Sequence, residues 1–370
     1  MGYAAVDDSR PKQLGAYRVL SLIGKGGMAR VYRCQHVETG EIVAVKVLYL
    51  AEHTDLKTLA FFEREIRAMQ QLRHPYIVPL RDYYLSAQLA YIVMPFFEST
   101  VADRLVTRLY SPREAAQMLT HLAYALDHAH SLGYIHCDLK PSNLMLDAKG
   151  QLYLADFGLA KSIGRRSADQ FAFGTPPYMA PELADGAAAD VRTDVYALGV
   201  LLCELLSGHR PFKAERITDY FYLHRRALPP APSQLNTVPA ALDSVILSAL
   251  SKAPAERPQS AGELAQCFYA AVAQLPDADQ HWNAPHTERP PIVLKPVKGG
   301  SGILRELNDQ PTLTRRPEQL ALSTTEQRAS PSPALPSATR ATRQAQNILI
   351  AVLLTSLAAL IVLIIFLIVR

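Results

Sequence analysis

The chain has 370 residues, of which 49% are apolar and 19% charged, and its formal net charge at pH 7 is +4. This composition excludes a wholly disordered protein and a collagen-like repeat. Residues 1–275 carry 28 basic and 27 acidic side chains, so we expect no nucleic-acid partner. The four cysteines are widely spaced and form no CxxC pair, which favours free thiols over a zinc site.

The first part of the chain predicts a short polar tail followed by an antiparallel sheet. Residues 1–14 read as the tail, and from residue 16 to about residue 40 apolar and β-branched side chains alternate with glycines. Residues 41–50 (EIVAVKVLYL) read as a further strand. Apolar side chains at spacings of four and three then predict an amphipathic helix with Phe62, Ile66 and Met69 on one face.

Helical patterns dominate the chain after residue 97. Ser111 and Glu114 form a predicted capping box around Pro112, and a second apolar helix is predicted from about Asp194 to Gly208. Because strands come first and helices afterwards, the sequence predicts an α+β fold with an antiparallel β N-terminal lobe and a mainly helical C-terminal lobe.

The C-terminal part of the chain changes in character. Residues 276–346 are rich in proline, serine and threonine, which predicts a disordered juxtamembrane linker. Residues 347–370 then read as a transmembrane helix, because 348–369 contain only two polar residues and span about 33 Å as a helix, against a bilayer core of about 30 Å. The alternative is a buried core helix, for which too little chain remains to provide a cover.

A glycine-rich segment, Gly24-Lys25-Gly26-Gly27, lies between two predicted strands. Glycines let backbone amides approach phosphate oxygens, although the segment alone could equally be a glycine-rich hairpin. Lys46 lies in the middle of an apolar strand, where an ammonium group needs an anionic partner. Glu65 is the candidate partner, because the apolar face of its helix carries it toward the sheet.

Two polar segments further along the chain predict a metal site. His136-Cys137-Asp138-Leu139-Lys140-Pro141-Ser142-Asn143 reads as a loop, and Asp156-Phe157-Gly158 follows thirteen residues after its last member. A carboxamide and a carboxylate on adjacent loops are hard oxygen ligands of the kind that Mg²⁺ binds together with phosphate. Each segment alone could be a plain turn.

In this order and at these spacings, the set of segments resembles the catalytic core of the protein kinase family from about Tyr17 to Leu275. The resemblance implies a bilobal protein kinase fold, a catalytic domain at 15–275, and the cofactors ATP and Mg²⁺. Lys140, two residues after Asp138, and the segment Gly174–Tyr178 resemble the serine/threonine branch, so Ser and Thr hydroxyls of proteins are the expected acceptors. The anchor adds a likeness to the membrane-bound eukaryotic-like kinases of bacteria.

The resemblance also implies a role for each catalytic residue. Asp138 would accept the proton of the acceptor hydroxyl, Lys140 would neutralise the γ-phosphate, and Asn143 with Asp156 would hold Mg²⁺. Lys46 would bind the α- and β-phosphates and pair with Glu65. The residues expected around the nucleotide are Ile23, Gly24, Lys25, Gly26, Gly27, Val31, Ala44, Lys46, Glu65, Met94, Pro95 and Phe97, with the Pro95 carbonyl and the Phe97 amide bonding to adenine.

Other family positions are structural or depart from the pattern. Glu182 is expected to pair with Arg257, and Asp194 to be the buried aspartate that supports the catalytic loop. Ala29 replaces the third glycine of the loop, for which we expect a modest effect on nucleotide affinity. Cys137 replaces the arginine that often binds an activating phosphate, so we expect no activation through that contact. A pseudokinase scaffold is the alternative, which the full set of motif residues disfavours.

The predicted anchor sets the expected location and partners. A domain that uses ATP and keeps free thiols belongs in the cytosol, so we expect a single-pass protein of the cell membrane with a cytoplasmic kinase domain and lipid as a partner. Small residues of the predicted helix, such as Ala351 and Thr355, offer a faint face for a homodimer. Linker residues such as Ser323 and Thr325 are expected to receive autophosphates, because tethering raises their effective concentration.

Overall fold

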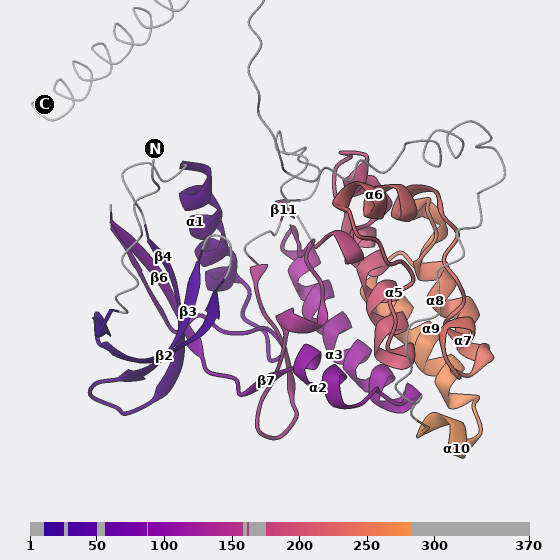
Figure 1. Ribbon diagram of the computed structural model, residues 1–370, viewed down its shortest axis with the longest axis horizontal. Coiled ribbons are helices and arrows are strands. Elements are labelled where there is room, and N and C mark those ends of the chain that lie inside the picture. Colours follow the sequence, from indigo (N-terminus) through magenta and orange to yellow (C-terminus); the bar gives the residue numbers. More distant parts are fainter. Residues whose placement is uncertain are drawn as a thin grey trace, which may run out of the picture. The chain divides into compact units, whose positions relative to one another are not determined.

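The computed structural model describes residues 11–25, 29–49, 56–86, 88–157, 161–162 and 175–282, all within a first unit, Met1–Leu304. These residues form an N-terminal lobe built on a sheet and a mainly helical C-terminal lobe (Figure 1). The predicted α+β order of the two lobes is therefore confirmed.

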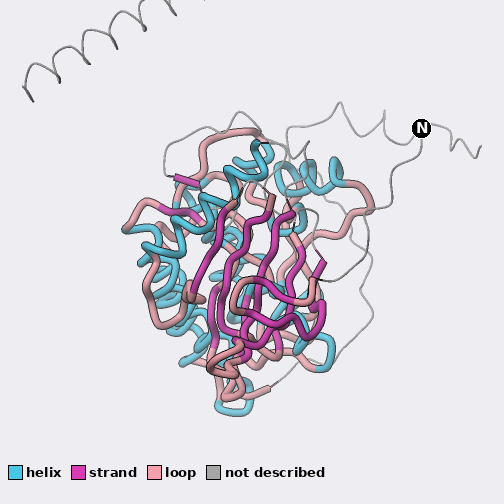
Figure 2. The backbone as a smooth tube through the Cα atoms, turned by 90° about the vertical axis from the view of Figure 1, so that its left-hand side faces the viewer, coloured by secondary structure: helices cyan, strands magenta, loops and turns pink. Residues whose placement is uncertain are grey.

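The N-terminal lobe is a six-stranded antiparallel sheet in the order β1-β2-β3-β4-β6-β5, with the helix α1, Leu56–Gln71, beside it. Figure 2 looks onto this lobe, where the strands run side by side. Strand β1 lies inside the predicted polar tail, because Leu14 is buried and pairs with Tyr17. The strands are β1 Gln13–Leu14, β2 Tyr17–Lys25, β3 Arg30–His36, β4 Ile42–Tyr49, β5 Asp82–Leu85 and β6 Leu89–Pro95.

Helix α1 packs its predicted apolar face against the sheet. Phe62, Ile66 and Met69 are all buried in one cluster with Leu48 of β4 and Ile92 of β6. Burial of large aliphatic and aromatic side chains typically stabilises a fold by about 1.5–3 kcal/mol each. Since Glu65 lies on the same face and is also buried, this packing fixes where its carboxylate points.

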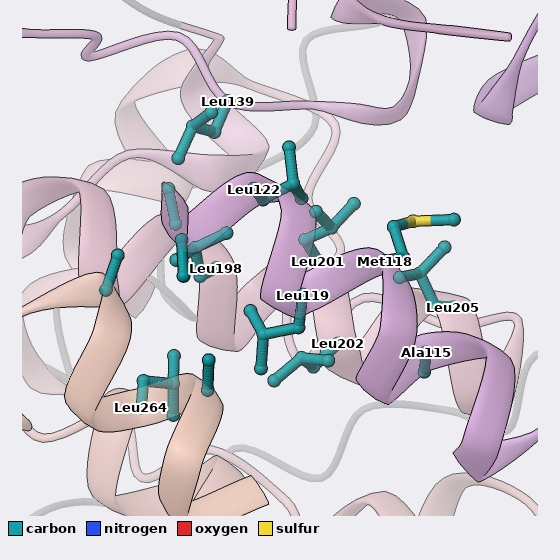
Figure 3. Close-up of a cluster of buried hydrophobic side chains, with 14 of the residues drawn as sticks. Ala115, Met118, Leu119, Leu122, Leu139, Leu198, Leu201, Leu202, Leu205 and Leu264 are labelled. Atoms are coloured by element: carbon teal, nitrogen blue, oxygen red, sulfur yellow. The ribbon is translucent and has the colours of Figure 1, made fainter. Parts of the chain in front are cut away.

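The C-terminal lobe is organised around α3 and α5. The predicted capping box of α3 is present, since the Ser111 hydroxyl accepts from the Glu114 amide and the Glu114 carboxylate accepts from the Ser111 amide. Helix α5 begins three residues before the predicted Asp194, because Asp190 caps its first turn. Figure 3 shows Leu119 and Leu122 of α3 interleaved with leucines of α5 and with Leu264.

The remaining elements complete the C-terminal lobe, which continues past the predicted boundary at residue 275 because a short helix, α10, follows it. Three small antiparallel pairings and several single-turn helices connect the larger elements. The helices are α2 Val101–Thr107, α3 Pro112–Ser131, α4 Pro181–Ala184, α5 Val191–Ser207, α6 Ile217–Arg226, α7 Pro232–Leu235, α8 Asp243–Ala249, α9 Ala261–Ala273 and α10 Asp277–Gln280, with 3-10 turns η1 Pro141–Asn143, η3 Pro176–Tyr178, η4 Ala240–Leu242 and η5 Pro254–Glu256. The strands are β7 Ser99–Thr100, β8 Tyr134–Ile135, β9 Leu144–Leu146, β10 Leu152–Leu154 and β11 Lys161–Ser162.

Within the described ranges, no helix is both long enough and apolar enough to cross a bilayer. The predicted membrane helix at 347–370 lies outside these ranges, as does the predicted linker from residue 283 onward.

A buried histidine of α6 predicts an acid-sensitive fold. His224 is fully buried, its Nδ1 lies 2.8 Å from the Tyr196 hydroxyl, and its ring contacts Phe212 edge-on at 5.1 Å. Burial, together with the nearby Lys252 ammonium, lowers the pKa of His224 from 6.5 to about 3. The folded protein therefore keeps this ring neutral, whereas the unfolded chain protonates it below about pH 6.5. The free energy of unfolding must fall as the pH drops from about 6.5 toward 3.

Between pH 7 and pH 5 the free energy of unfolding should fall in both proteins, but by about 2 kcal/mol less in the His224→Phe variant than in the wild type. The reason is that unfolding of the wild type at pH 5 takes up one proton at His224, whereas phenylalanine takes up none. Urea unfolding at the two pH values measures both losses. Equal losses in the two proteins would contradict this account of His224.

Candidate active site

Lys46 of β4 lies between two carboxylates that come from different parts of the chain. Its Nζ is 2.8 and 2.9 Å from the two oxygens of Glu65 on α1, and 3.0 Å from Oδ1 of Asp156. The predicted ion pair between Lys46 and Glu65 is therefore present. The three side chains join the sheet, α1 and the segment after β10 at one point.

Burial and charge act in opposite directions on these three groups. Burial alone would lower the pKa of Lys46, but the carboxylates of Glu65 and Asp156 outweigh it and raise that pKa. Burial raises the pKa of Glu65 in spite of the adjacent ammonium. For Asp156, burial is outweighed by Lys46, which lowers the pKa of the carboxyl. Lys46 is thus a permanent cation, and Asp156 is an anion at neutral pH.

The loop before η1 is held in place by a carboxylate of α5. Asp194 is fully buried, and its Oδ2 accepts from the His136 amide at 2.9 Å while its Oδ1 accepts from the Cys137 amide at 2.9 Å. Its Oδ2 also lies 2.8 Å from Nε2 of His130. Cys137 has a φ of 64°, a conformation that costs a non-glycine residue energy, so these bonds stabilise a strained backbone. The expected support of this loop by Asp194 is present.

Cys137 packs into an apolar cluster. The family pattern has a charged arginine at this position. The cluster contains Met179, Leu183 and Ala184, which lie on the segment that leads into and forms α4. A neutral thiol fits this environment, because an unpaired buried charge there would be costly.

Asp138 is surrounded by donors on both carboxylate oxygens. Its Oδ1 accepts from the Thr175 hydroxyl at 2.7 Å, and its Oδ2 accepts from Lys140 Nζ at 2.5 Å and from Asn143 Nδ2 at 3.1 Å. Lys140 also donates to the Thr175 hydroxyl at 2.9 Å. Asn143 uses its nitrogen again for a 2.8 Å bond to the backbone oxygen of Asp138. The arrangement fixes the carboxylate and the ammonium side by side.

The segment before Asp156 is linked to the same loop. His136 is fully buried, its Nε2 lies 3.0 Å from the carbonyl oxygen of Ala155, and its ring meets Phe157 edge-on at 4.7 Å. Asp156 has a φ of 67°, a left-handed conformation that is uncommon for a residue other than glycine. The neighbours on both sides of Asp156 are thus tied to His136.

A pocket of about 790 Å³ opens between the two lobes next to Lys46. Ten of the sequence-predicted residues line it: Ile23, Val31, Ala44, Lys46, Glu65, Met94, Pro95, Phe97, Asn143 and Asp156. Gly24 and Lys25 end strand β2, whereas Gly26 and Gly27 lie outside the described residues. Asp138 and Lys140 do not line this pocket. Asn143 does line it, and its side chain also donates a hydrogen bond to the Asp138 carboxylate.

Several residues of the site were missed by sequence reasoning. Val78, Met145 and Leu154 supply apolar walls of the pocket, and Thr175 completes the bonds around Asp138. Met145 lies two residues after Asn143 in a short strand, so alternation along β9 was the signal that could have found it. Thr175 lies in the Gly174–Tyr178 segment that resembles the serine/threonine branch, but its bond to Asp138, across 37 residues of chain, was not predicted.

An ion pair between Arg257 and Glu182 links two segments of the C-terminal lobe. The Arg257 guanidinium is fully buried and donates to Glu182 in two bonds of 2.9 and 2.8 Å. It also donates to the backbone oxygens of Ser251, Lys252 and Arg192. The expected pairing of Glu182 with Arg257 is present and joins α4 to the segment after α8.

Residues 17–269 match the family model described as Protein kinase domain, which covers more than half of the chain. The chain belongs to the protein kinase family. The family assignment agrees with the fold and with the grouping of motif residues around Lys46 and Asp138.

Relatives of the chain are bacterial kinases. Serine/threonine-protein kinase PknD of Mycobacterium tuberculosis (strain CDC 1551 / Oshkosh) is 35% identical over 275 residues, which cover 73% of this chain and 41% of that protein. Probable serine/threonine-protein kinase PknB of Lactococcus lactis is 37% identical over 242 residues, or 64% of this chain and 39% of the relative. Serine/threonine-protein kinase PrkC of Bacillus subtilis is 32% identical over 255 residues, or 68% and 39%. The kinase domain thus falls in the bacterial eukaryotic-like serine/threonine branch, and the chain spans about two fifths of the length of these relatives.

Proposed function

We propose that this protein transfers the γ-phosphate of ATP to Ser and Thr hydroxyls of proteins. The observation that carries the proposal is the ion network of Lys46, Glu65 and Asp156 in a pocket that also contains Asn143, which bonds to the Asp138 carboxylate. Phosphoryl transfer requires positioning and neutralisation of charge more than covalent chemistry by the protein, and this site supplies both.

The side chains present fit a magnesium nucleotide. Val31 and Ala44 from the sheet and Met145 from the C-terminal lobe form apolar walls suited to a flat base. Asn143 and Asp156 offer oxygen atoms of the kind that Mg²⁺ prefers, and the Asp156 side chain remains 39% exposed. When bound, ATP would supply the phosphoryl group and Mg²⁺ would offset its charge.

The residues of the chain then have distinct tasks. Lys46 would bind phosphate oxygens, with Glu65 holding its ammonium in place through the packing of α1. Asp138 would accept the proton of the acceptor hydroxyl, because Thr175 and Asn143 fix its carboxylate. Lys140 would offset charge on the transferred group while bonded to Asp138.

Phosphoamino-acid analysis tests the proposal. The purified full chain, incubated with ATP, Mg²⁺ and a generic basic protein, is expected to yield phosphoserine or phosphothreonine in that protein. ATP binding with no transfer would contradict the proposal and would favour the pseudokinase alternative. Phosphotyrosine as the product would contradict the serine/threonine assignment.

We also propose, from the sequence, a membrane anchor, a cellular location and two further properties of this protein. The apolar run at 348–369 supports a single membrane-spanning helix, with lipid as a partner and the kinase domain on the cytoplasmic side. Autophosphorylation of the Ser- and Thr-rich linker and homodimer formation are part of the same proposal. The packing of Cys137 supports activity without a phosphate contact at that position.

A further inference from the structure

A second pocket, of about 780 Å³, lies between α2 and the catalytic loop. One wall consists of Ala102, Leu105 and Val106, which recur at spacings of three and four and therefore share a face of α2. Pro141 and Tyr178 contribute further apolar surface from the other side. The nucleotide pocket described above does not include any of these five residues.

The second pocket adjoins the group that would accept the proton. Lys140 and Thr175 both line it, and both bind the Asp138 carboxylate at 2.5 and 2.7 Å. A polypeptide that presents a hydroxyl to Asp138 would therefore bring its neighbouring residues next to this pocket. The position of the pocket points to the acceptor polypeptide as its occupant.

The α2 wall is aliphatic and held rigidly. Val106 is 80% exposed, so most of its apolar surface is open to water, whereas Leu105 packs partly against the core of the lobe. The first turn of α2 is fixed by a capping box between Thr100 and Asp103. A side chain that covers Val106 removes apolar surface from water without reorganising the helix.

The charges around the pocket disfavour a basic occupant. Glu204, which lines it, has a side chain only 15% exposed and accepts a hydrogen bond from the Tyr178 hydroxyl. Its other oxygen lies 3.6 Å from Nε of Arg210, so its charge is already offset. Lys140 also lines the pocket and contributes a positive charge. Among the described residues of the pocket, no carboxylate remains to pair with a Lys or Arg of the substrate.

We propose that this pocket binds an aliphatic side chain, Leu, Ile, Val or Met, close in sequence to the Ser or Thr that is phosphorylated, and selects it over Arg or Lys. This inference rests on the proposed function and narrows its substrate class. Val106 and Leu105 act here as specificity-determining residues, since both line this pocket and neither lines the nucleotide pocket.

A peptide series tests the preference in the wild-type full chain. Each peptide holds one acceptor serine in an Ala/Gly background, with Leu, Arg, Asp or Ala at a single flanking position. We expect Leu at one position to raise kcat/KM about tenfold over Arg at that position, because part of its side chain becomes buried.

The Val106→Glu variant tests whether the pocket causes that preference. A carboxylate at this position should abolish the advantage of Leu and favour Arg, while leaving the KM for ATP unchanged. Val37→Glu is the matched control, because Val37 is a 53% exposed valine on the turn between β3 and β4 and should keep the Leu preference.

The outcomes separate this inference from the proposed function. Phosphorylation of a generic protein together with no preference for Leu, or a preference that survives Val106→Glu, overturns the pocket assignment alone. Absence of transfer to every peptide and protein overturns the proposed function and the pocket assignment with it. A Leu preference lost in Val106→Glu and kept in Val37→Glu supports both.

Discussion

The Asp138→Asn variant should lose about 10³-fold in the rate of phosphate transfer while it keeps its affinity for ATP. An amide cannot accept the proton of the acceptor hydroxyl, and general-base groups typically contribute about 10²–10⁴-fold. The bonds that Asp138 receives from Lys140, Thr175 and Asn143 fix its position, so asparagine should occupy the same place. Steady-state kinetics with a saturating protein substrate measures the loss.

Asp279→Asn is the control for this experiment, because Asp279 is an exposed carboxylate on α10 and undergoes the same chemical change. It should transfer phosphate at the wild-type rate. Nucleotide binding by Asp138→Asn, measured by titration, should stay within a factor of about three, since Asp138 does not line the pocket next to Lys46. A wild-type transfer rate in Asp138→Asn would remove Asp138 from the proposed mechanism.

The Arg257→Met variant should lower the free energy of unfolding by about 3–5 kcal/mol. Its guanidinium is fully buried, and Glu182 would be left as a buried carboxylate without its main partner. Three backbone oxygens would lose their donor as well. Urea unfolding at pH 7 measures the change.

Two further variants identify the cause of that loss. Arg67→Ala breaks an exposed pair with Glu63, whose side chains are 67% and 40% exposed, and should cost no more than about 1 kcal/mol. The double variant Arg257→Met, Glu182→Leu should recover part of the stability, because it removes the unpaired charge that the single change creates. A loss under 1 kcal/mol in Arg257→Met would show that the buried pair does not hold the lobe together.

The sequence predicted those parts of the site that depend on local pattern. Glu65 was identified from its place on the apolar face of a helix, and that face determines the direction of its carboxylate in the structure. Lys46 was found because an ammonium in an apolar strand needs anions, and it has two of them. In both cases periodicity and the cost of burying charge were sufficient.

Other parts of the site depend on contacts that no local pattern encodes. The bond between Thr175 and Asp138, like the walls formed by Val78 and Leu154, exists only once distant segments are packed together. The left-handed backbone of Cys137 follows from the carboxylate of Asp194, 57 residues away. The sequence predicts that α5 begins at about Asp194, but it begins at Val191, because the Asp190 side chain caps its first turn.

The charges of the site make a single comparison decisive for the central claim, that Lys46, Asp138, Asn143 and Asp156 form one centre for phosphate transfer. The measurement is the rate of γ-phosphate transfer to Ser and Thr by the wild type and by Asp156→Asn at saturating ATP and Mg²⁺. Removal of the Asp156 charge takes away an anion held 3.0 Å from Lys46 and an expected Mg²⁺ ligand, so transfer should fall to background in a folded variant. Transfer at the wild-type rate by Asp156→Asn would contradict the account.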